Sequence, residues 1–303
     1  YIWFEFSIPY ILKKHKIDIF VSPDGYTPLR SKVPSLSVFH DLNFEHYPED
    51  LPKVEKLYYQ KFFPKYAKKT TRIATVSEFS KQDICKQYSI DPNKIDVVYN
   101  GSNTEYKPLS KTVISATKKQ YSNGKEYFLF VGSLHPRKNL TNLFKAFDKF
   151  KRENNSDIKL LLVGASKWWT PEIKNTFDSL LHKKDIVICG RLSTEELRKV
   201  LGSALSLTYV SYFEGFGIPI VEAFYSGVSV ITSNCTSMPE VAGDAAIIID
   251  PFSVEDISDA MKKIAFDKDL RQRLIIKGHE RAKVFTWQKT ADRLWYSIIK
   301  TSR

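Results

Sequence analysis

The feature that most constrains the fold of this chain is a repeated alternation of short apolar segments with helical segments. In the later part of the chain, six apolar runs alternate with turns and helical patterns: residues 127–131, 158–163, 186–189, 206–210, 228–232 and 246–249. Runs this apolar are typical of strands buried on both faces, as in a parallel sheet covered by helices. The alternation therefore predicts a doubly wound, Rossmann-like α/β domain.

The earlier part of the chain shows the same alternation. Short apolar runs occupy residues 17–21, 34–39, 72–76 and 95–99, and helical patterns cover residues 1–16, 52–69 and 80–88. The segment 108–125 is polar with little apolar periodicity, which predicts a linker with a surface segment. A chain of 303 residues is long enough for two domains. We therefore expect one domain over residues 1–108 and a second over residues 109–285.

Composition and charge narrow the class of protein. The net charge of +12 comes largely from lysines, which form either a solvated surface or a surface for an anionic membrane or substrate. No nucleic-acid-binding motif accompanies the charge, so nucleic acid is not the expected partner. The three cysteines form no CxxC pair, which argues against a zinc cluster and fits a reducing, cytoplasmic setting.

The sequence also bears on membranes and on the amino terminus. No apolar run reaches the roughly 18 residues that a membrane-spanning helix needs. The sequence starts without Met or a secretory pattern, in the middle of a helical pattern. We expect a cytoplasmic location, with peripheral contact at the inner face of the membrane if the basic surface meets anionic lipid. We also expect the natural amino terminus to lie upstream, so that the first domain is truncated.

The loop after residue 131 carries two adjacent cations. It reads Gly132-Ser-Leu-His-Pro-Arg137-Lys138-Asn and leads into a helical pattern. In a doubly wound sheet, ligands bind beyond the carboxyl ends of the strands, where this loop is expected. An arginine fork and a lysine point charge both suit a diphosphate. The alternative is a pair of solvated surface cations.

The segment after residue 210 combines two acids with two glycines. Glu214 and Glu222 flank Gly215 and Gly217 at a predicted helix start. We expect the glycines to let the backbone approach a ligand closely and the amides of residues 216–218 to face an anion. Glu222, one turn into the helix, is placed to accept hydrogen bonds from ribose hydroxyls. The alternative is that Glu222 only caps or solvates the helix.

One histidine stands at the end of a predicted strand. His40 follows the apolar run 34–39 and precedes Asp41. A histidine in this position either lines a ligand cleft or caps the strand and bonds within the core. The neighbouring carboxylate at a strand's carboxyl end favours the cleft.

From about Val33 to Trp295 the chain resembles the family 4 (group 1) retaining glycosyltransferases and looks like their mannosyltransferases. The motifs that carry the resemblance, in chain order, are His40-Asp41, Val76-Ser-Glu-Phe-Ser80, Asn100-Gly101, Gly132 to Asn139, Glu214 to Glu222 as the family's EX7E element, Ser237-Met-Pro-Glu-Val241 and Phe285-Thr-Trp287. The resemblance implies the GT-B fold, in which two Rossmann-like domains face each other across a cleft. It also implies that the last helix, residues 286–303, crosses back onto the first domain.

The resemblance also implies roles for individual residues. Arg137 and Lys138 match cations that hold the donor diphosphate, a task that replaces a divalent metal, and His40 matches a histidine near the donor sugar and acceptor. Glu214 matches the acid that contacts the transferred sugar, and Glu222 matches the acid that binds the ribose. The remaining implied donor contacts are the backbone cradle of Gly132, Gly215, Phe216, Gly217 and Ile218 and the base-side loop residues Arg191 and Leu192. Ser133 departs from the family, where many members have arginine.

The resemblance therefore implies a retaining, metal-independent hexosyltransferase of polysaccharide or lipopolysaccharide biosynthesis. It needs no cofactor beyond a nucleotide-sugar co-substrate, for which GDP-mannose is our choice, and its acceptor is a glycan or a lipid-linked oligosaccharide. Two alternatives remain open: a non-catalytic nucleotide-sugar binding protein, and a GT-B epimerase or sugar-phosphate synthase.

Overall fold

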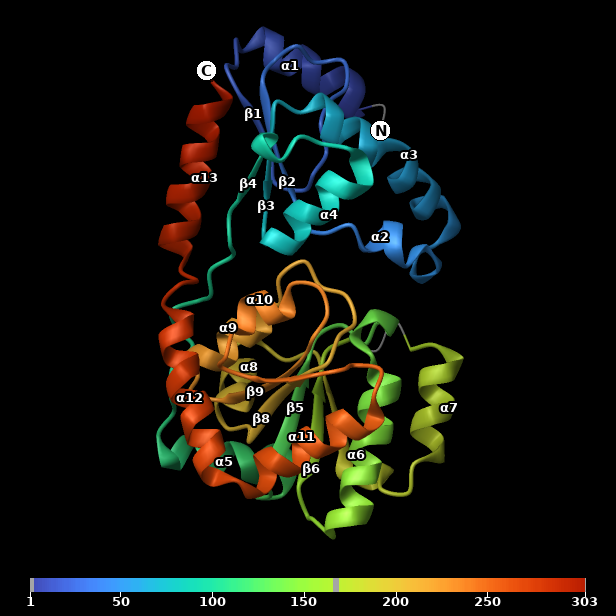
Figure 1. Cartoon of the computed structure of the whole chain (residues 1–303), viewed down its shortest axis with the longest axis vertical. Helices are drawn as coiled ribbons and strands as arrows, with labels where there is room; N and C mark the ends of the chain where they lie inside the picture. The colour runs from blue at the N-terminus through green and yellow to red at the C-terminus, as the bar shows by residue number, and fades with distance from the viewer. Residues whose placement is uncertain (1–2, 166–168, 303) are drawn as a thin grey trace. The chain divides into compact units, whose positions relative to one another are not determined.

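The computed structural model describes residues 3–165 and 169–302. The chain divides into two compact units (Figure 1). The first unit comprises residues 1–101, 214–216 and 287–303, and the second comprises residues 102–213 and 217–286. The strand-rich later part of the sequence thus forms most of the second unit, while a short internal segment and the last helix join the first.

The first unit is built on a parallel sheet of four strands in the order β1-β2-β3-β4. The strands are β1 (Phe20–Ser22), β2 (Ser35–Phe39), β3 (Arg72–Thr75) and β4 (Ile95–Val97). The helices are α1 (Ile8–Lys14), α2 (Asn43–His46), α3 (Lys53–Lys69), α4 (Glu78–Tyr88) and α13 (Trp287–Thr301). The apolar run predicted at 17–21 becomes a strand only from Phe20, and the predicted first helix begins as a π-helical turn over Trp3–Ser7; residues 1–2 lie outside the described residues.

Side chains on the two faces of this sheet pack into two separate hydrophobic cores. Phe39, Ile73 and Ile95 pack with residues of α3 and α4 on one face. Leu36 and Ala74 pack with Leu294 and Ile298 of α13 on the other. Successive strand residues point to opposite faces, so covering both faces requires helices on both sides. The last helix is therefore an integral part of the first unit.

The second unit is built on a parallel six-stranded sheet in the order β10-β9-β8-β5-β6-β7. The strands are β5 (Tyr127–Val131), β6 (Lys159–Val163), β7 (Ile186–Gly190), β8 (Ser206–Tyr209), β9 (Ser229–Ser233) and β10 (Ile247–Ile249). They correspond to the six predicted runs, which confirms the doubly wound α/β class. Strand order reverses between β5 and β8, and in such sheets ligands bind beyond the carboxyl ends of the strands at this switch point.

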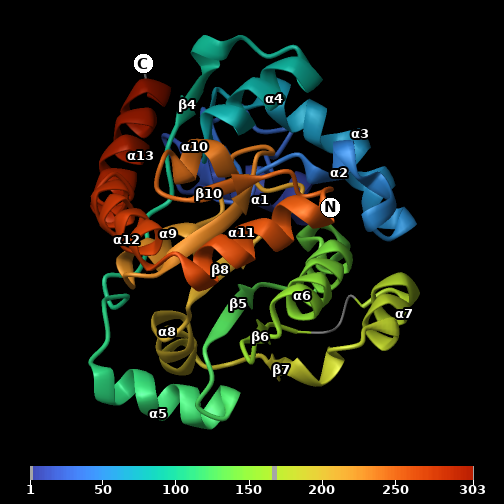
Figure 2. The same cartoon turned by 60° about the horizontal axis from the view of Figure 1, so that its bottom comes forward.

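Eight α-helices of the second unit lie within the described ranges. They are α5 (Lys111–Ser122), α6 (Leu140–Asn154), α7 (Pro171–Ser179), α8 (Thr194–Gly202), α9 (Ile218–Tyr225), α10 (Met238–Ala242), α11 (Val254–Phe266) and α12 (Lys268–Ala282). Figure 2 shows α6 and α11 on one face of the sheet, where their apolar residues share a core with β5 and β6.

The prediction of a linker over residues 108–125 is wrong, because most of this segment is the helix α5. The Ser110 hydroxyl accepts a hydrogen bond from the Val113 amide at the start of the helix, and Asn123 in the left-handed region ends it. The helix buries Thr117 and Ser122 rather than a broad apolar stripe. Small polar residues at the buried positions removed the apolar periodicity from which a helix is recognised in a sequence.

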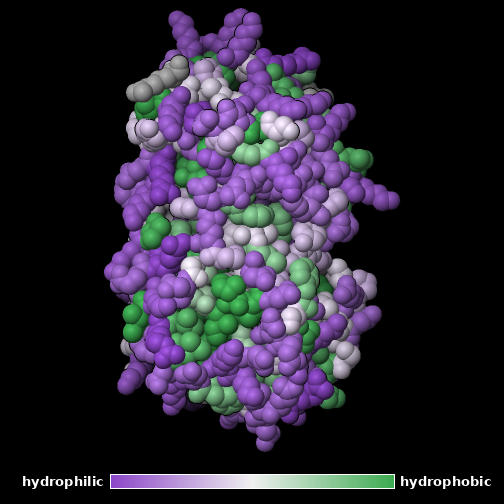
Figure 3. Space-filling view, viewed as in Figure 1, coloured by the Kyte–Doolittle hydropathy of each residue, from purple (hydrophilic) through white to green (hydrophobic). Residues whose placement is uncertain are grey.

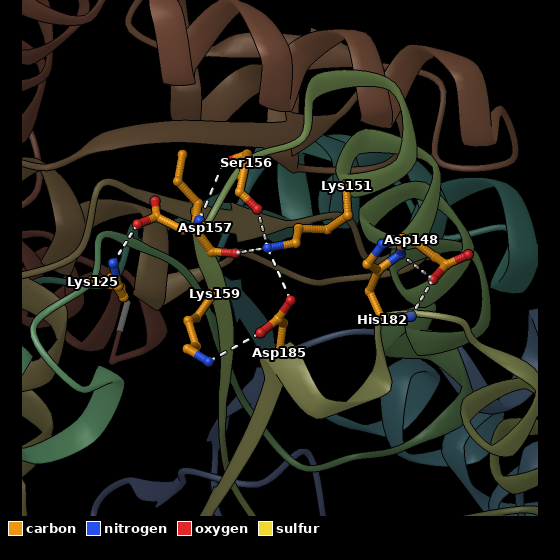
Figure 4. Close-up of polar contacts among 9 residues, drawn as sticks. Lys125, Asp148, Lys151, Ser156, Asp157, Lys159, His182 and Asp185 are labelled. Carbon is orange, nitrogen blue, oxygen red and sulfur yellow. Dashed lines mark hydrogen bonds and ion pairs between the residues drawn. The ribbon is translucent and has the colours of Figure 1, made fainter.

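A partly buried ionic network lies at the end of the second sheet where β6 and β7 begin (Figure 4). Lys151 of α6 is 5% exposed, and its ammonium lies 2.9 Å from Asp185. Lys159 reaches the other oxygen of the same carboxylate at 3.0 Å. Burial opposes ionisation of Asp185, but the hydrogen bonds from the two lysines outweigh it and hold its pKa below the usual value. This network is structural, since it lies at the strand ends opposite those that bind ligands.

Surface and membrane features are plain. Figure 3 shows a mainly hydrophilic face with scattered apolar surface. Across residues 3–165 and 169–302, the structure contains no helix long and apolar enough to cross a bilayer.

Candidate functional site

Glycines bring the loops after β5, β6 and β7 close together. The Gly132 amide donates to the Val163 carbonyl at 2.9 Å, and the Gly164 amide donates to the Gly190 carbonyl at 2.8 Å. A Cβ at Gly164 would lie 1.7 Å from the Gly132 carbonyl oxygen, so only glycine fits there. Gly132 has φ +148°, a conformation that favours glycine. These glycines therefore let the loops at the carboxyl ends of the strands pack closely together.

The two predicted cations lie on a short 3-10 turn in the loop after β5. The turn covers Pro136–Lys138, and the His135 ring accepts a hydrogen bond from the Arg137 amide at its start. Lys138 is only 6% exposed, and its ammonium donates to the Tyr209 hydroxyl at 2.7 Å. A Cβ at Gly132 would lie 3.8 Å from the same ammonium. Lys138 is thus a buried cation held between β5 and β8, at the switch point.

Arg137 is directed to the same edge of the sheet. Its guanidinium donates to the Phe213 carbonyl at 3.0 Å, just beyond the end of β8. Its own carbonyl accepts from the Tyr212 amide at 3.0 Å. The alternative of two solvated surface cations is wrong for Lys138, which is buried. A preorganised, water-poor cation acts strongly on an anion placed beside it.

The structure also shows what Asn139, the next residue of this loop, contacts. Asn139 is in the left-handed region at φ 60°, where Asn is favoured among non-glycine residues. Its buried amide nitrogen donates to the Val210 carbonyl at 3.1 Å and the Pro251 carbonyl at 2.6 Å. These bonds tie the cation turn to the segments after β8 and β10. The Pro-Arg-Lys-Asn motif contained this residue, but spacing alone did not assign it a task.

Glu222 lies one turn into α9 and has a partner that sequence reasoning missed. The hydroxyl of Tyr106, a residue only 4% exposed, hydrogen-bonds the Glu222 carboxylate. Burial raises the pKa of Glu222 to about 7, and the bond from Tyr106 opposes this rise. Burial and the neighbouring carboxylate raise the pKa of Tyr106 above its usual value. Glu222 is therefore partly buried and hydrogen-bonded within the second unit, and it does not cap α9.

The EX7E element is divided between the two units. Gly217, at φ +98°, is the residue before α9, and its carbonyl accepts from the Ile220 amide at 3.0 Å. Glu214–Phe216 belong to the first unit instead. The Ser77 hydroxyl donates to the Gly215 carbonyl at 2.7 Å. Glu214 is buried at 6% exposure.

Gly215 lies against the backbone of the residues that follow β2. A Cβ at this position would lie 2.0 Å from the His40 carbonyl oxygen and 2.9 Å from the Asp41 Cβ. The space that glycine leaves is therefore filled by the protein's own backbone rather than by a ligand. The next residue, Phe216, is 4% exposed and its ring lies 6.2 Å from that of Tyr99.

His40 stands exposed at the end of β2. Its Nε2 lies 2.9 Å from the Pro23 carbonyl oxygen. A carbonyl only accepts, so Nε2 carries a proton, and Nδ1 is the acceptor whenever the ring is neutral. His40 and Asp41 border a cavity of about 460 Å³ in the first unit. Its other lining residues are Asp24, Tyr26, Val38, Phe39, Phe44, Tyr59 and Phe63.

The structure therefore groups some predicted residues and separates others. Gly132, Arg137 and Lys138 gather around the ends of β5 and β8. Arg191 and Leu192 follow β7, which β6 separates from β5, and Arg191 is exposed. Within the part of the chain that the structure describes, no group of three or more His, Cys, Asp or Glu side chains is arranged to hold a metal ion.

Comparison with solved structures defines the class of protein. HepE from Anabaena, solved in complex with UDP and glucose, matches with a TM-score of 0.81 and 15% identity over 96% of this chain and 80% of its own. A glycosyltransferase from Rickettsia africae matches with a TM-score of 0.77 and 19% identity over 98% of this chain and 80% of its own. The two α/β units thus form a GT-B glycosyltransferase fold.

The sequence comparisons identify the family. The model "Glycosyl transferases group 1" matches residues 114–281, and the model "Glycosyltransferase Family 4" matches residues 1–106. The O-antigen chain mannosyltransferase B of Escherichia coli is 30% identical over 91% of this chain and 73% of its own length. This chain belongs to the group 1 glycosyltransferases.

Proposed function

We propose that this protein transfers a hexose from a nucleotide-diphosphate sugar to a glycan or lipid-linked acceptor, with retention and without a metal. The observation that carries the proposal is the buried Lys138 beside Tyr209 at the switch point, with Arg137 on the same turn. Two cations at this edge suit the two charged groups of a diphosphate. The same charges would stabilise the departing nucleotide, which is the task of a divalent metal in other transferases.

In the proposed reaction the acceptor hydroxyl attacks the anomeric carbon on the face that the nucleotide leaves. The bond between the anomeric carbon and the β-phosphate oxygen breaks, the bond to the acceptor oxygen forms, and the β-phosphate takes the acceptor proton. Arg137 and Lys138 hold the diphosphate as its negative charge grows. Glu214 contacts the transferred sugar, and His40 offers Nδ1 to a hydroxyl of the donor sugar or acceptor.

Glu222 is the proposed ribose ligand. An ionised carboxylate accepts hydrogen bonds from two ribose hydroxyls. Burial raises the pKa of Glu222 to about 7, so this carboxyl is partly protonated near neutral pH. Ribose hydroxyls would stabilise the anion, so donor binding and ionisation of Glu222 favour each other. Gly132 and the amides at residues 216–218 complete the proposed cradle, and Arg191 and Leu192 lie on the proposed base side.

We infer mannose from GDP-mannose as the donor group, because the 30% identical relative is an O-antigen chain mannosyltransferase. The acceptor would then be a growing polysaccharide chain, and the protein would act in the cytoplasm at the inner face of the membrane. A sugar-phosphate synthase or a non-catalytic binding protein on the same fold would have a similar donor site. Turnover therefore has to be measured.

The test is a panel of GDP- and UDP-sugars with glycan and sugar-phosphate acceptors, with and without EDTA. We expect release of GDP, a product that retains the donor's anomeric configuration, and no loss of rate in EDTA. Lys138→Met should lower the rate by about 100-fold or more, the usual effect of removing one preorganised charge donor. Lys184→Met, at an exposed site where β7 begins, is the matched control. Transfer only to sugar phosphates, or binding without turnover, would contradict the proposal.

A further inference from the structure

The motif that runs from Val76 to Ser80 has no task in the proposed reaction, yet it places two hydroxyl groups at the start of α4. Ser77 and Ser80 are both buried in the first unit. The Ser77 hydroxyl accepts a hydrogen bond from the Ser80 amide at 3.0 Å, which caps the helix. An Asp or Asn side chain caps a helix as well as Ser does, so capping alone does not require a hydroxyl at this position.

The two hydroxyls also act as donors to backbone carbonyls. Ser77 donates to the Gly215 carbonyl at 2.7 Å. The Ser80 hydroxyl lies 3.3 Å from the same carbonyl oxygen and 3.4 Å from the His40 carbonyl oxygen. Because a hydroxyl carries one proton, the shorter distance assigns the Ser77 proton to Gly215, and Ser80 shares its own proton between the two carbonyls. A carboxylate at either position would have no proton to donate.

The segment that carries these serines also holds the backbone of His40. The hydroxyl of Thr75, the last residue of β3, donates to the Phe39 carbonyl at 2.7 Å, and Ser80 reaches the next carbonyl along the chain. Gly215 packs directly against this backbone, since a Cβ there would lie 2.0 Å from the His40 carbonyl oxygen. Buried hydroxyls of one short segment therefore join the chain at His40 to the chain at Gly215.

We propose that Ser77 and Ser80 are positioning residues for sugar transfer. Their hydroxyls hold the Gly215 carbonyl, and with it the neighbouring peptide groups, in one orientation. Glycine restricts its own backbone least, so bonds from other residues are needed to keep this segment in one conformation. The orientation places the buried Glu214 relative to His40, and both are proposed to contact the reacting sugars. The inference rests on the proposed function, whereas the hydrogen bonds do not.

Loss of these hydroxyls should change the rate of transfer rather than the affinity for the nucleotide. Misplacing a reacting group by about 1 Å lowers a rate by about 100-fold. Arg137 and Lys138, which are proposed to hold the diphosphate, belong to the second unit. A serine that served only to cap α4 would instead affect stability and leave the kcat of the folded protein unchanged.

The experiment measures kcat, the KM for the nucleotide sugar and the calorimetric affinity for GDP. We expect Ser77→Ala to lower kcat by about 10- to 100-fold, with GDP affinity within about twofold of the parent. Ser80→Ala loses only the longer bonds and should lower kcat less. Ser77→Thr keeps a hydroxyl on the same carbon and should recover most of the lost kcat. All variants are compared below the onset of their thermal unfolding.

The matched control is Ser253→Ala. Ser253 caps α11 in the second unit by accepting the Asp256 amide at 3.1 Å, so this variant removes a helix cap of the same kind. It should lower stability by a similar amount and leave kcat within about twofold of the parent. An equal fall of kcat in Ser77→Ala and Ser253→Ala would overturn the proposal, because the loss would then follow from capping.

Hydrogen exchange measured by mass spectrometry reports on the same segment without turnover. The peptide that contains residues 214–216 should exchange faster in Ser77→Ala than in the parent by roughly tenfold or more, while peptides of α11 should be unchanged. A parent that binds GDP but transfers no sugar would contradict the proposed function and the positioning role together. Transfer by the parent with neither kcat nor exchange altered in Ser77→Ala would overturn the positioning role alone.

Discussion

Replacing Glu222 with Gln gives a sharp test of the partly buried carboxyl in the candidate site. Gln keeps the shape of the side chain and can accept the hydrogen bond from Tyr106, but it carries no charge. Burial raises the pKa of Glu222 from 4.5 to about 7, so ionising this side chain is costly in the folded protein. The variant should therefore be more stable than the parent where the parent's Glu222 is ionised.

The direction and size of the expected change in stability follow from the linkage between protonation and folding. Between pH 4.5 and about 7 the folded chain holds a proton on Glu222 that the unfolded chain has released, so parent stability falls as pH rises through this range. The rise of the pKa of Glu222 from 4.5 to about 7 corresponds to about 3 kcal/mol, and solvent at the edge of this partly buried group reduces that figure. The free energy of unfolding of the Glu222→Gln variant should equal that of the parent at pH 4.5 and exceed it by about 1–3 kcal/mol at pH 8.5.

The assay is unfolding of parent and variant by urea at both pH values, paired with titration of GDP. The variant should gain stability only at high pH and should bind GDP more weakly, because the amide is a poorer acceptor for ribose. Glu195→Gln is the control. This exposed carboxylate is paired with Lys199, and its replacement should not raise the stability of the protein at high pH. An equal effect of Glu222→Gln at both pH values would refute the reasoning.

Three further perturbations have defined outcomes. Tyr106→Phe removes the hydrogen bond that favours the Glu222 anion, so the midpoint of GDP affinity against pH should move upward; an unchanged profile would give Tyr106 only a packing role. Gly215→Ala places a Cβ 2.0 Å from the His40 carbonyl and should destabilise the first unit by about 1–3 kcal/mol in urea unfolding, and parent-like stability would contradict this contact. Asp185→Asn leaves buried Lys151 without its carboxylate and should cost about 3 kcal/mol in the same measurement, a loss that should be absent for exposed Asp157→Asn.

The fold and the place of the loop that carries Arg137 and Lys138 could be predicted from local patterns in the sequence. Each strand of the second sheet is apolar enough to be recognised alone, and Gly132 and Lys138 are close in sequence to the strand whose end they occupy. Position at the carboxyl end of a strand was sufficient to locate such residues, because parallel sheets gather those ends at one edge.

Features that depend on distant partners did not follow from the sequence. Tyr106 lies in a polar segment, and nothing nearby links it to Glu222 in α9. Gly215 was interpreted as room for a ligand because the contact that fills its space, the His40 backbone, comes from another part of the chain. Helix α5 was missed because its buried positions are Thr and Ser. In each case the feature depends on tertiary packing, which the local sequence does not show.

The central claim is that a diphosphate binds at Lys138 and Arg137, and comparison of GDP with GMP tests it most directly. Calorimetric titration of both nucleotides, with UDP and UMP as the second pair, isolates the contribution of the second phosphate. The account predicts that the parent prefers the diphosphate of at least one pair by tenfold or more and that Lys138→Met abolishes this preference while monophosphate affinity changes little. An equal preference for the diphosphate in parent and variant would contradict it.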